Sequence, residues 1–118
     1  MCFRMRSDSD RQKFRQELLK KSKNGNVVLW KNLCKVGKTS YKSDIRNCIY
    51  KKGFIKKSDR KTVYLTDTEV ASSNIYYGIH VYTKKQDYLH HLYRVVCNLA
   101  DLVDINEKEA VFMKVKLI

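Results

Sequence analysis

The sequence contains no proline and only four glycines among its 118 residues. This composition excludes a collagenous chain, a proline-rich linker and a glycine-rich repeat. No apolar run approaches the ~18 residues of a membrane span, and no apolar stretch follows Met1–Arg6, so neither a membrane segment nor a secretory signal is expected. The cysteines form no CxxC pair; they are Cys2, Cys34, Cys48 and Cys97. Reduced thiols, and therefore a cytoplasmic protein, are expected.

Negative charge is also scarce, and lysine and arginine are abundant instead. There are 25 Lys and Arg residues against 12 Asp and Glu, which gives a net charge of +13 and a pI near 9.7. Residues 1–62 carry 19 basic and 5 acidic residues, whereas residues 63–118 carry 6 and 7. This asymmetry predicts that the first half contacts a polyanion while the second half supplies the scaffold. A lysine-rich surface that only keeps the protein soluble is the alternative.

The apolar pattern predicts an α+β fold in one small domain. Residues 1–25 are expected to form a basic N-terminal helix or arm, and residues 26–118 a single α+β domain. This domain is expected to hold a small, mainly antiparallel sheet with one or two packed helices. Capping oxygens in Ser7–Asp10 precede the helical segment Arg11–Lys23, and Asn24-Gly25 is a typical helix stop.

The remaining segments divide between strands and helices. Val27–Trp30 and Ile75–Thr83 are rich in β-branched and aromatic residues, which favours strands. A closing strand is expected over residues 111–117, with its lysines on one face and its apolar residues on the other. The apolar spacing predicts short helices over Ser40–Lys52 and Lys85–Leu92.

Two further segments are less clear from the pattern. Phe54-Ile55 and Thr62–Thr66 are typical of two short strands joined by a basic turn. Tyr93–Leu99 fits either a continuation of the preceding helix or a strand centred on Val95-Val96. Both interpretations of Tyr93–Leu99 stay open at this stage.

Residues Ser40–Thr66 resemble the second half of a winged-helix module. An amphipathic segment is followed by KKGFI, a basic hairpin and a strand that ends in LT. In that family the helix enters the major groove and the hairpin, or wing, contacts the DNA backbone. The resemblance implies that DNA contacts come from the helix and the wing, through Lys42, Arg46, Lys51, Lys56, Lys57, Arg60 and Lys61.

A second resemblance covers more of the chain. The segments that carry it occur in this order: Trp30-Lys31, Ser58-Asp59-Arg60, Leu65-Thr66 with Glu69, GIHVY (78–82), DLV (101–103) and EAVFMKV (109–115). Together they resemble a class of small, mostly uncharacterised proteins encoded by tailed phages. The resemblance implies a compact α+β domain in which Tyr93–Leu99 is a strand, and it implies no activity.

No motif points to catalysis or to a cofactor. The VGKTS of Val36–Ser40 has Asn32 where a phosphate-binding loop needs a glycine. His80, His90, His91 and Cys97 lack the spacing of a zinc finger, so no metal is expected.

Nucleophilic and acid–base catalysis are poorly supported as well. Cys34 and Cys48 occupy apolar-face positions, which favours inert core thiols. The acidic residues of the second half are expected to form a loop region without the apolar surroundings that raise a pKa; they are Asp101, Asp104, Glu107 and Glu109. We therefore do not expect an enzyme.

The sequence thus predicts a non-catalytic protein that binds nucleic acid or a host nucleoprotein complex. With a phage origin, a role as a stoichiometric inhibitor of a host defence system, such as a CRISPR effector, in the host cytoplasm is expected. The expected nucleic-acid contacts are Lys20, Lys21, Lys23, Lys42, Arg46, Lys51, Lys52, Lys56, Lys57, Arg60 and Lys61. The tyrosines expected to stack on bases are Tyr41, Tyr50 and Tyr64. The alternative is a winged-helix transcription regulator in which Arg46 reads base edges.

Overall fold

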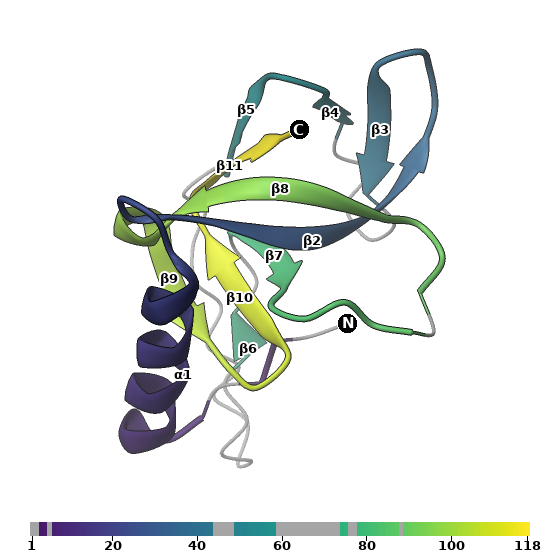
Figure 1. Cartoon of the computed structure of the whole chain (residues 1–118). Helices are drawn as coiled ribbons and strands as arrows, with labels where there is room; N and C mark the ends of the chain where they lie inside the picture. The colour runs from purple at the N-terminus through teal and green to yellow at the C-terminus, as the bar shows by residue number, and fades with distance from the viewer. Residues whose placement is uncertain (1–2, 5, 44–48, 59–73, 76–77, 88) are drawn as a thin grey trace.

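The protein is mainly antiparallel β-sheet. The computed structural model describes residues 3–4, 6–43, 49–58, 74–75, 78–87 and 89–118. These residues form one nine-stranded sheet, a two-stranded sheet, the helix α1 (Asp8–Lys21) and the short 3-10 helix η1 (Leu99–Asp101) (Figure 1). The expected α+β fold with one or two packed helices was therefore wrong, because strands dominate the described residues and α1 is their single α-helix.

Helix α1 begins and ends where the sequence supplies capping groups. The Ser7 hydroxyl accepts a hydrogen bond from the backbone N–H of Asp10 at 3.3 Å. The helix begins at Asp8, three residues earlier than expected, and its first turn carries acidic residues that suit the helix dipole. After Lys21, positive φ angles at Asn24 and Gly25 turn the chain into the first long strand.

Strand β2 (Asn26–Lys35) is the centre of the large sheet. One of its edges pairs with β8 (Leu92–Asn98) along most of its length. Its other edge pairs with β7 (Ile79–Tyr82) near the middle and with β3 (Ser40–Ser43) near the end. The segment around Val95 is therefore a strand, as the second resemblance implied.

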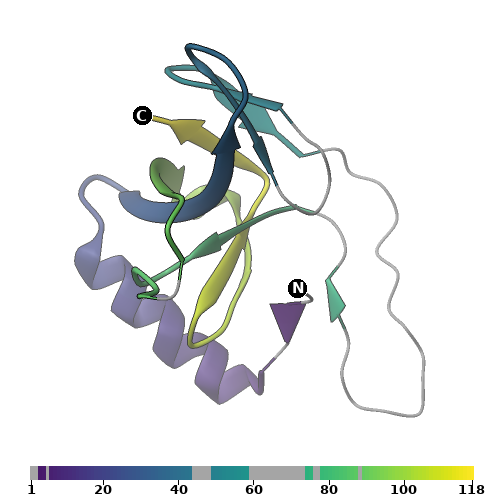
Figure 2. The same cartoon turned by 90° about the vertical axis from the view of Figure 1, so that its right-hand side faces the viewer.

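The sheet extends to both sides of β2 (Figure 2). Beyond β8 come β11 (Lys114–Leu117) and β5 (Ile55–Lys57), and β3 pairs with β4 (Ile49–Lys51). Beyond β7 come β10 (Glu109–Phe112) and β9 (Leu102–Ile105). The two-stranded sheet consists of β1 (Phe3–Arg4) and β6 (Asn74–Ile75).

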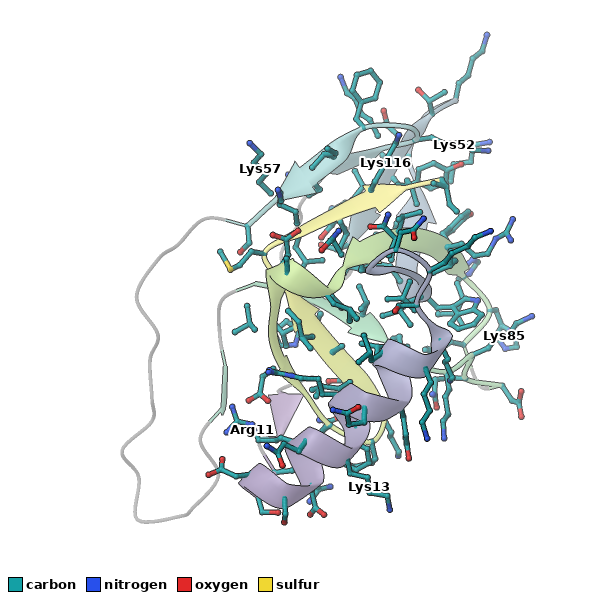
Figure 3. All side chains as sticks on the ribbon, turned by 60° about the vertical axis from the view of Figure 1, so that its left-hand side comes forward. Arg11, Lys13, Lys52, Lys57, Lys85 and Lys116 are labelled. Atoms are coloured by element: carbon teal, nitrogen blue, oxygen red, sulfur yellow. The ribbon has the colours of Figure 1, made fainter. Side chains whose placement is uncertain are left out.

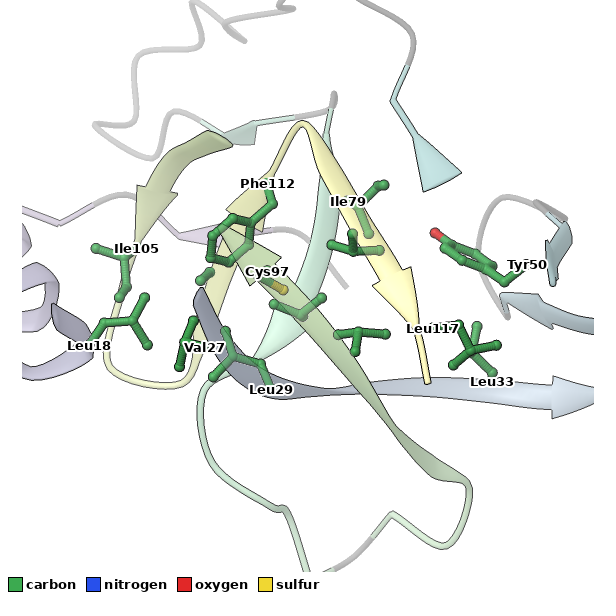
Figure 4. Packing of buried hydrophobic residues seen from close by; sticks show 14 of the residues in the cluster. Leu18, Val27, Leu29, Leu33, Tyr50, Ile79, Cys97, Ile105, Phe112 and Leu117 are labelled. Carbon is green, nitrogen blue, oxygen red and sulfur yellow. The ribbon is translucent and has the colours of Figure 1, made fainter. Parts of the chain in front are cut away.

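The core lies between the inward faces of these strands (Figure 4). Val27, Leu29 and Leu33 alternate along β2 with exposed or half-buried residues, as a strand with one buried face requires. Phe112 of β10 is fully buried, and Leu18 of α1 belongs to the same cluster.

Two expected helices are absent from the described residues. The segment Ser40–Lys52 forms β3 and β4, and residues 44–48 between them lie outside the described residues. In Lys85–Leu92 the described residues form turns, with the Leu89 N–H bonded to the Gln86 carbonyl, before β8 begins. Both helix predictions were wrong because a short apolar spacing fits a helix and a strand equally, and pairing with β2 and its neighbours favours the strand.

Two expected strands are split. The chain over 111–117 leaves β10 at Met113, whose N–H bonds the Asp101 carbonyl, and then enters β11 with new partners. Along Ile75–Thr83 the described strands are β6 and β7, while residues 76–77 lie outside the described set. The expected strand Phe54-Ile55 is found one residue later as β5, and Thr62–Thr66 is not described.

Helix α1 is too short and too polar to cross a membrane, and the described part of the chain holds no other helix that could do so.

Candidate nucleic-acid interface

The outward face of β11 and β5 carries cations because of strand alternation. In β11, Val115 and Leu117 are buried, whereas Lys114 and Lys116 point to the opposite face and are exposed. The antiparallel register places Lys57 of β5 directly across from Lys114. Opposed residues on one face of an antiparallel pair have Cβ atoms about 5 Å apart. Two like charges are therefore held close together with no carboxylate between them on these two strands.

The same face continues across β8 and β2. Lys116 pairs with Ile55 on one side and with Val96 on the other, and Val96 pairs with Val28. In the neighbouring row, Arg94 of β8 pairs with Trp30 of β2. We call this surface the basic sheet face; it consists of Val28, Trp30, Ile55, Lys57, Arg94, Val96, Lys114 and Lys116.

The basic sheet face is open to solvent. Ile55 is 61% exposed and Val28 is 42% exposed, which shows that no described element covers them. Figure 3 places Lys57 and Lys116 at the same end of the molecule as Lys52, away from Arg11 on α1.

The turn between β4 and β5 borders this face. The Gly53 N–H donates to the Leu117 carbonyl at 2.7 Å, which attaches the turn to the end of β11. Phe54 closes the turn and is 67% exposed. Lys51 and Lys52 precede it and are also exposed.

Lys56 differs from its neighbours because it faces the other side of β5. It pairs with buried Val115, and its ammonium lies 5.7 Å from the centre of the Tyr50 ring. Lys31 approaches the same ring at 5.9 Å, and its Nζ donates to the His80 carbonyl at 2.7 Å. These two lysines are held by internal contacts, whereas those of the basic sheet face extend outward.

Acidic residues are separated from this surface. Among the described residues, the strands β2, β3, β4, β5, β8 and β11 contain no Asp or Glu. The described Asp and Glu side chains lie on α1, in the 84–87 loop, or from η1 to β10; they are Asp8, Asp10, Glu17, Asp87, Asp101, Asp104, Glu107 and Glu109. Asp44 and Asp59 lie outside the described residues. An ion pair crosses this division between Lys114 Nζ and Asp101 Oδ1, which lie 3.9 Å apart.

Several of these acidic side chains are buried or paired with an arginine. Asp104 is 1% exposed, and its Oδ1 accepts from Arg11 Nε at 2.8 Å. Arg6 forms an ion pair with Glu107, and this hydrogen bond lowers the pKa of Glu107. Burial raises the pKa of Glu109 on β10. The expectation of an acidic loop was wrong, because Asp104 and Glu109 are strand residues packed inside the protein.

The predicted contact residues fall into three groups. Lys51, Lys52, Lys56 and Lys57 come together on β4, β5 and their turn, and Lys42 lies on β3 in register with Ile49 of β4. Lys20, Lys21 and Lys23 lie at the end of α1 and in the turn that leads to β2. Arg46, Arg60 and Lys61 lie outside the described residues. None of the described members forms an ion pair with a described carboxylate.

The tyrosines expected to stack on bases are placed differently. Tyr41 and Tyr50 are 6% and 4% exposed and belong to the core, where Tyr41 contacts the Tyr93 ring at 4.6 Å between centroids. A base cannot reach a ring face that is packed inside the protein, so these two tyrosines are corrected to core residues. Tyr64 lies outside the described residues.

Sequence reasoning missed Arg94, Lys114, Lys116 and Phe54. The alternation in β11 did place its two lysines on one face, but only the register with β5 joins them to Lys57. Phe54 was assigned to a strand, and its exposure depends on the turn in which it lies.

The structure describes two cysteines, Cys34 and Cys97. Cys34 is exposed on β2, so its expected position on an apolar face was wrong, and Cys48 lies outside the described residues. Burial raises the pKa of Cys97 to about 12, with a smaller contribution from the charge of Asp101. The described ranges contain no group of three or more His, Cys, Asp or Glu residues that could hold a metal ion.

Comparison of the chain with protein-family models, with curated proteins and with solved structures gave no match. The resemblance to a tailed-phage class therefore stays a prediction.

Proposed function

We propose that the protein binds nucleic acid through the basic sheet face, without catalysing a reaction. The observation that supports this proposal is the separation of charge. The face and the β3–β4–β5 region beside it carry cations and no described Asp or Glu side chain, while the described acidic side chains lie on other elements, where Asp104 and Glu109 are buried and Glu107 is paired with Arg6. A surface that only needed to be soluble would gain from interspersed charges of both signs.

The chemistry of the side chains favours the phosphate backbone over the base edges. Lysine is the main cation of this surface, and it acts on phosphate as a point charge. The planar fork of arginine is best suited to bidentate recognition of a guanine edge, and Arg94 is the arginine among the residues of the face. We therefore infer binding with little sequence preference, in which affinity comes from phosphate contacts and counterion release.

The test is the salt dependence of affinity for a fluorescent single-stranded oligonucleotide, measured by anisotropy. Lys57→Gln combined with Lys114→Gln removes two neighbouring charges from the face. If both contact phosphate, the slope of log affinity against log salt becomes less negative by about 1.4, at about 0.7 per contact for a single strand.

The matched control is Lys13→Gln combined with Lys85→Gln, which removes the same charge from exposed positions on α1 and in the 84–87 loop. The control pair should leave the slope close to that of the unmodified protein. Equal changes of the slope in the two double variants would show that binding depends on the net charge alone and not on the basic sheet face. No binding at about 150 mM salt would contradict the proposal, because surviving affinity there needs direct phosphate contacts.

The predicted partner, a host nucleoprotein complex, belongs to the same proposal. Recovery of a host complex with the tagged protein, measured with and without nuclease treatment, tests it. Recovery that is lost after nuclease treatment supports a nucleoprotein partner, and recovery that resists nuclease contradicts binding through nucleic acid. The winged-helix alternative is not proposed, because its recognition helix is replaced by β3 and β4.

A further inference from the structure

Phe54 is a large apolar side chain at an exposed position among cations. It is 67% exposed, more than the other exposed large hydrophobic residues of the described chain. It closes the turn between β4 and β5, with Lys52 and Lys51 two and three residues before it and Lys56-Lys57 starting two residues after it. The core is complete without it, because Phe54 is neither in the buried cluster nor packed against it among the described residues.

The backbone around Phe54 is held in place although the side chain is exposed. The N–H of Phe54 donates to the Lys51 carbonyl at 3.1 Å, which closes the turn. The preceding N–H, of Gly53, donates to Leu117 at the end of β11. These bonds fix the backbone of Phe54 directly before Ile55, which lies opposite Lys116 on the basic sheet face. A ligand that reaches the ring therefore meets a largely preformed site.

We propose that Phe54 stacks on an unpaired base and that the ligand is single-stranded nucleic acid; this inference rests on the proposed function. Proteins that bind single strands combine a basic surface for the backbone with aromatic rings on which bases stack. In a duplex the base faces are already stacked on each other, so an exposed ring on a surface turn has no base face to contact. An exposed Phe54 with lysines before and after it in the sequence therefore favours a single strand over a duplex as the ligand.

The apolar residues of the basic sheet face fit the same ligand. Ile55 is 61% exposed beside Phe54, and Val28 lies further along the same face at 42%. Unpaired bases have apolar surface that is removed from water when it contacts these aliphatic side chains. The phosphate backbone that a duplex presents has no such apolar surface. Lys57, Lys114 and Lys116 lie among them and can reach the phosphates of the same strand.

The experiment compares Phe54→Ala, Phe54→Leu and Phe54→Tyr in binding to a single-stranded oligonucleotide and to its duplex. Loss of stacking should weaken single-strand binding about 5- to 140-fold in the alanine variant. The leucine variant, which keeps an apolar side chain, should lose most of the same affinity, and the tyrosine variant should keep it. Duplex binding should change less than twofold in all three variants.

Two controls separate stacking from other effects. Leu19→Ala removes an exposed apolar side chain, 50% exposed, from α1 and should leave binding unchanged. The salt slope should also stay unchanged in the Phe54 variants, because no phosphate contact is removed. Phe54 is exposed, so its replacement should leave the thermal unfolding midpoint close to that of the unmodified protein.

The possible failures of the two proposals have different signatures. If the lysine pair alters the salt slope but Phe54→Ala binds as well as the unmodified protein, stacking is refuted and nucleic-acid binding stands. Equal losses on duplex and single strand would also refute the inference. If neither oligonucleotide binds and Phe54→Ala instead abolishes self-association in sedimentation velocity, the exposed ring joins two copies of the chain and both proposals fail.

Discussion

Gly78 and Gly53 share a left-handed backbone conformation, with φ of +86° at each, but their surroundings differ. A Cβ at Gly78 would lie 2.4 Å from Cγ1 of Val111, which is fully buried in β10. A Cβ at Gly53 would meet nothing within 4 Å. Gly78 is thus required by packing as well as by conformation, whereas Gly53 is required by conformation only.

This pair gives a prediction in which one variant is the control for the other. Gly53→Ala should lower the free energy of unfolding by about 1–2 kcal/mol, because an L-residue is strained in the left-handed conformation. Gly78→Ala should cost about 1–3 kcal/mol more, because the added methyl displaces Val111 in a packed core. Urea denaturation followed by circular dichroism measures both. Equal losses would mean that Val111 moves aside without cost.

Among the elements, α1 is attached to the sheet by few contacts. Leu18 enters the core at 3% exposure, while its neighbour Leu19 is 50% exposed. Towards the start of the helix, Arg11 pairs with buried Asp104 of β9. The Oδ2 atom of Asp104 has no hydrogen-bond partner among the described residues, so this carboxylate depends on Arg11 for its neutralisation.

Because Leu18 is the buried residue of α1, and Phe14 packs against the core only partly buried, helix attachment is predicted to depend on Leu18. Leu18→Ala should destabilise the protein by about 2–4 kcal/mol, through lost burial and the cavity left behind. Leu19→Ala removes the same atoms from a surface position and should change stability by less than about 0.5 kcal/mol. Chemical denaturation of the two variants makes the comparison. Similar losses would place the helix in a different register from the one described.

The elements also show how far sequence patterns predict this fold. The capping residues around Ser7 and the β-branched start of β2 predicted a helix and a strand that the structure confirms. The helix over Ser40–Lys52 was predicted because Tyr41 and Ile49 are spaced as on one face of a helix, and this prediction was wrong. In the structure, Tyr41 and Tyr50 point inward from two paired strands, and Ile49 points outward at 44% exposure. That arrangement depends on pairing with β2, which no local pattern contains.

At the scale of the whole molecule, the charge asymmetry of the sequence does not map onto two halves of the structure. Lys114 and Lys116 come from the second half of the sequence, yet they lie on the same face as Lys57 from the first. The second half is therefore not only a scaffold. Antiparallel pairing between β5 and β11 brings these residues together, and the sequence contains no local signal for such a distant contact.

Concentrated cations should also make the free protein sensitive to salt. With a net charge of +13, repulsion within the basic sheet face opposes the compact state, and salt screens it. The ion pair of Arg11 with Asp104 is largely buried at the carboxylate and is screened less. The unfolding midpoint of the free protein is therefore expected to rise between about 20 and 200 mM salt.

A bound polyanion should reverse this dependence. A ligand that binds only the folded protein stabilises it, by about 2.7 kcal/mol at a free concentration of 100 Kd, and Kd for a polyanion rises steeply with salt. The midpoint with excess oligonucleotide should therefore start high, fall as salt increases, and meet the rising midpoint of the free protein. Differential scanning fluorimetry along a salt series measures both curves.

The Lys57→Gln, Lys114→Gln variant should show a flatter curve in each case, since it loses both the repulsion and the ligand contacts. A free-protein midpoint that falls with salt would instead mean that favourable ion pairs outweigh the repulsion, and the basic sheet face would then not be a concentrated positive surface.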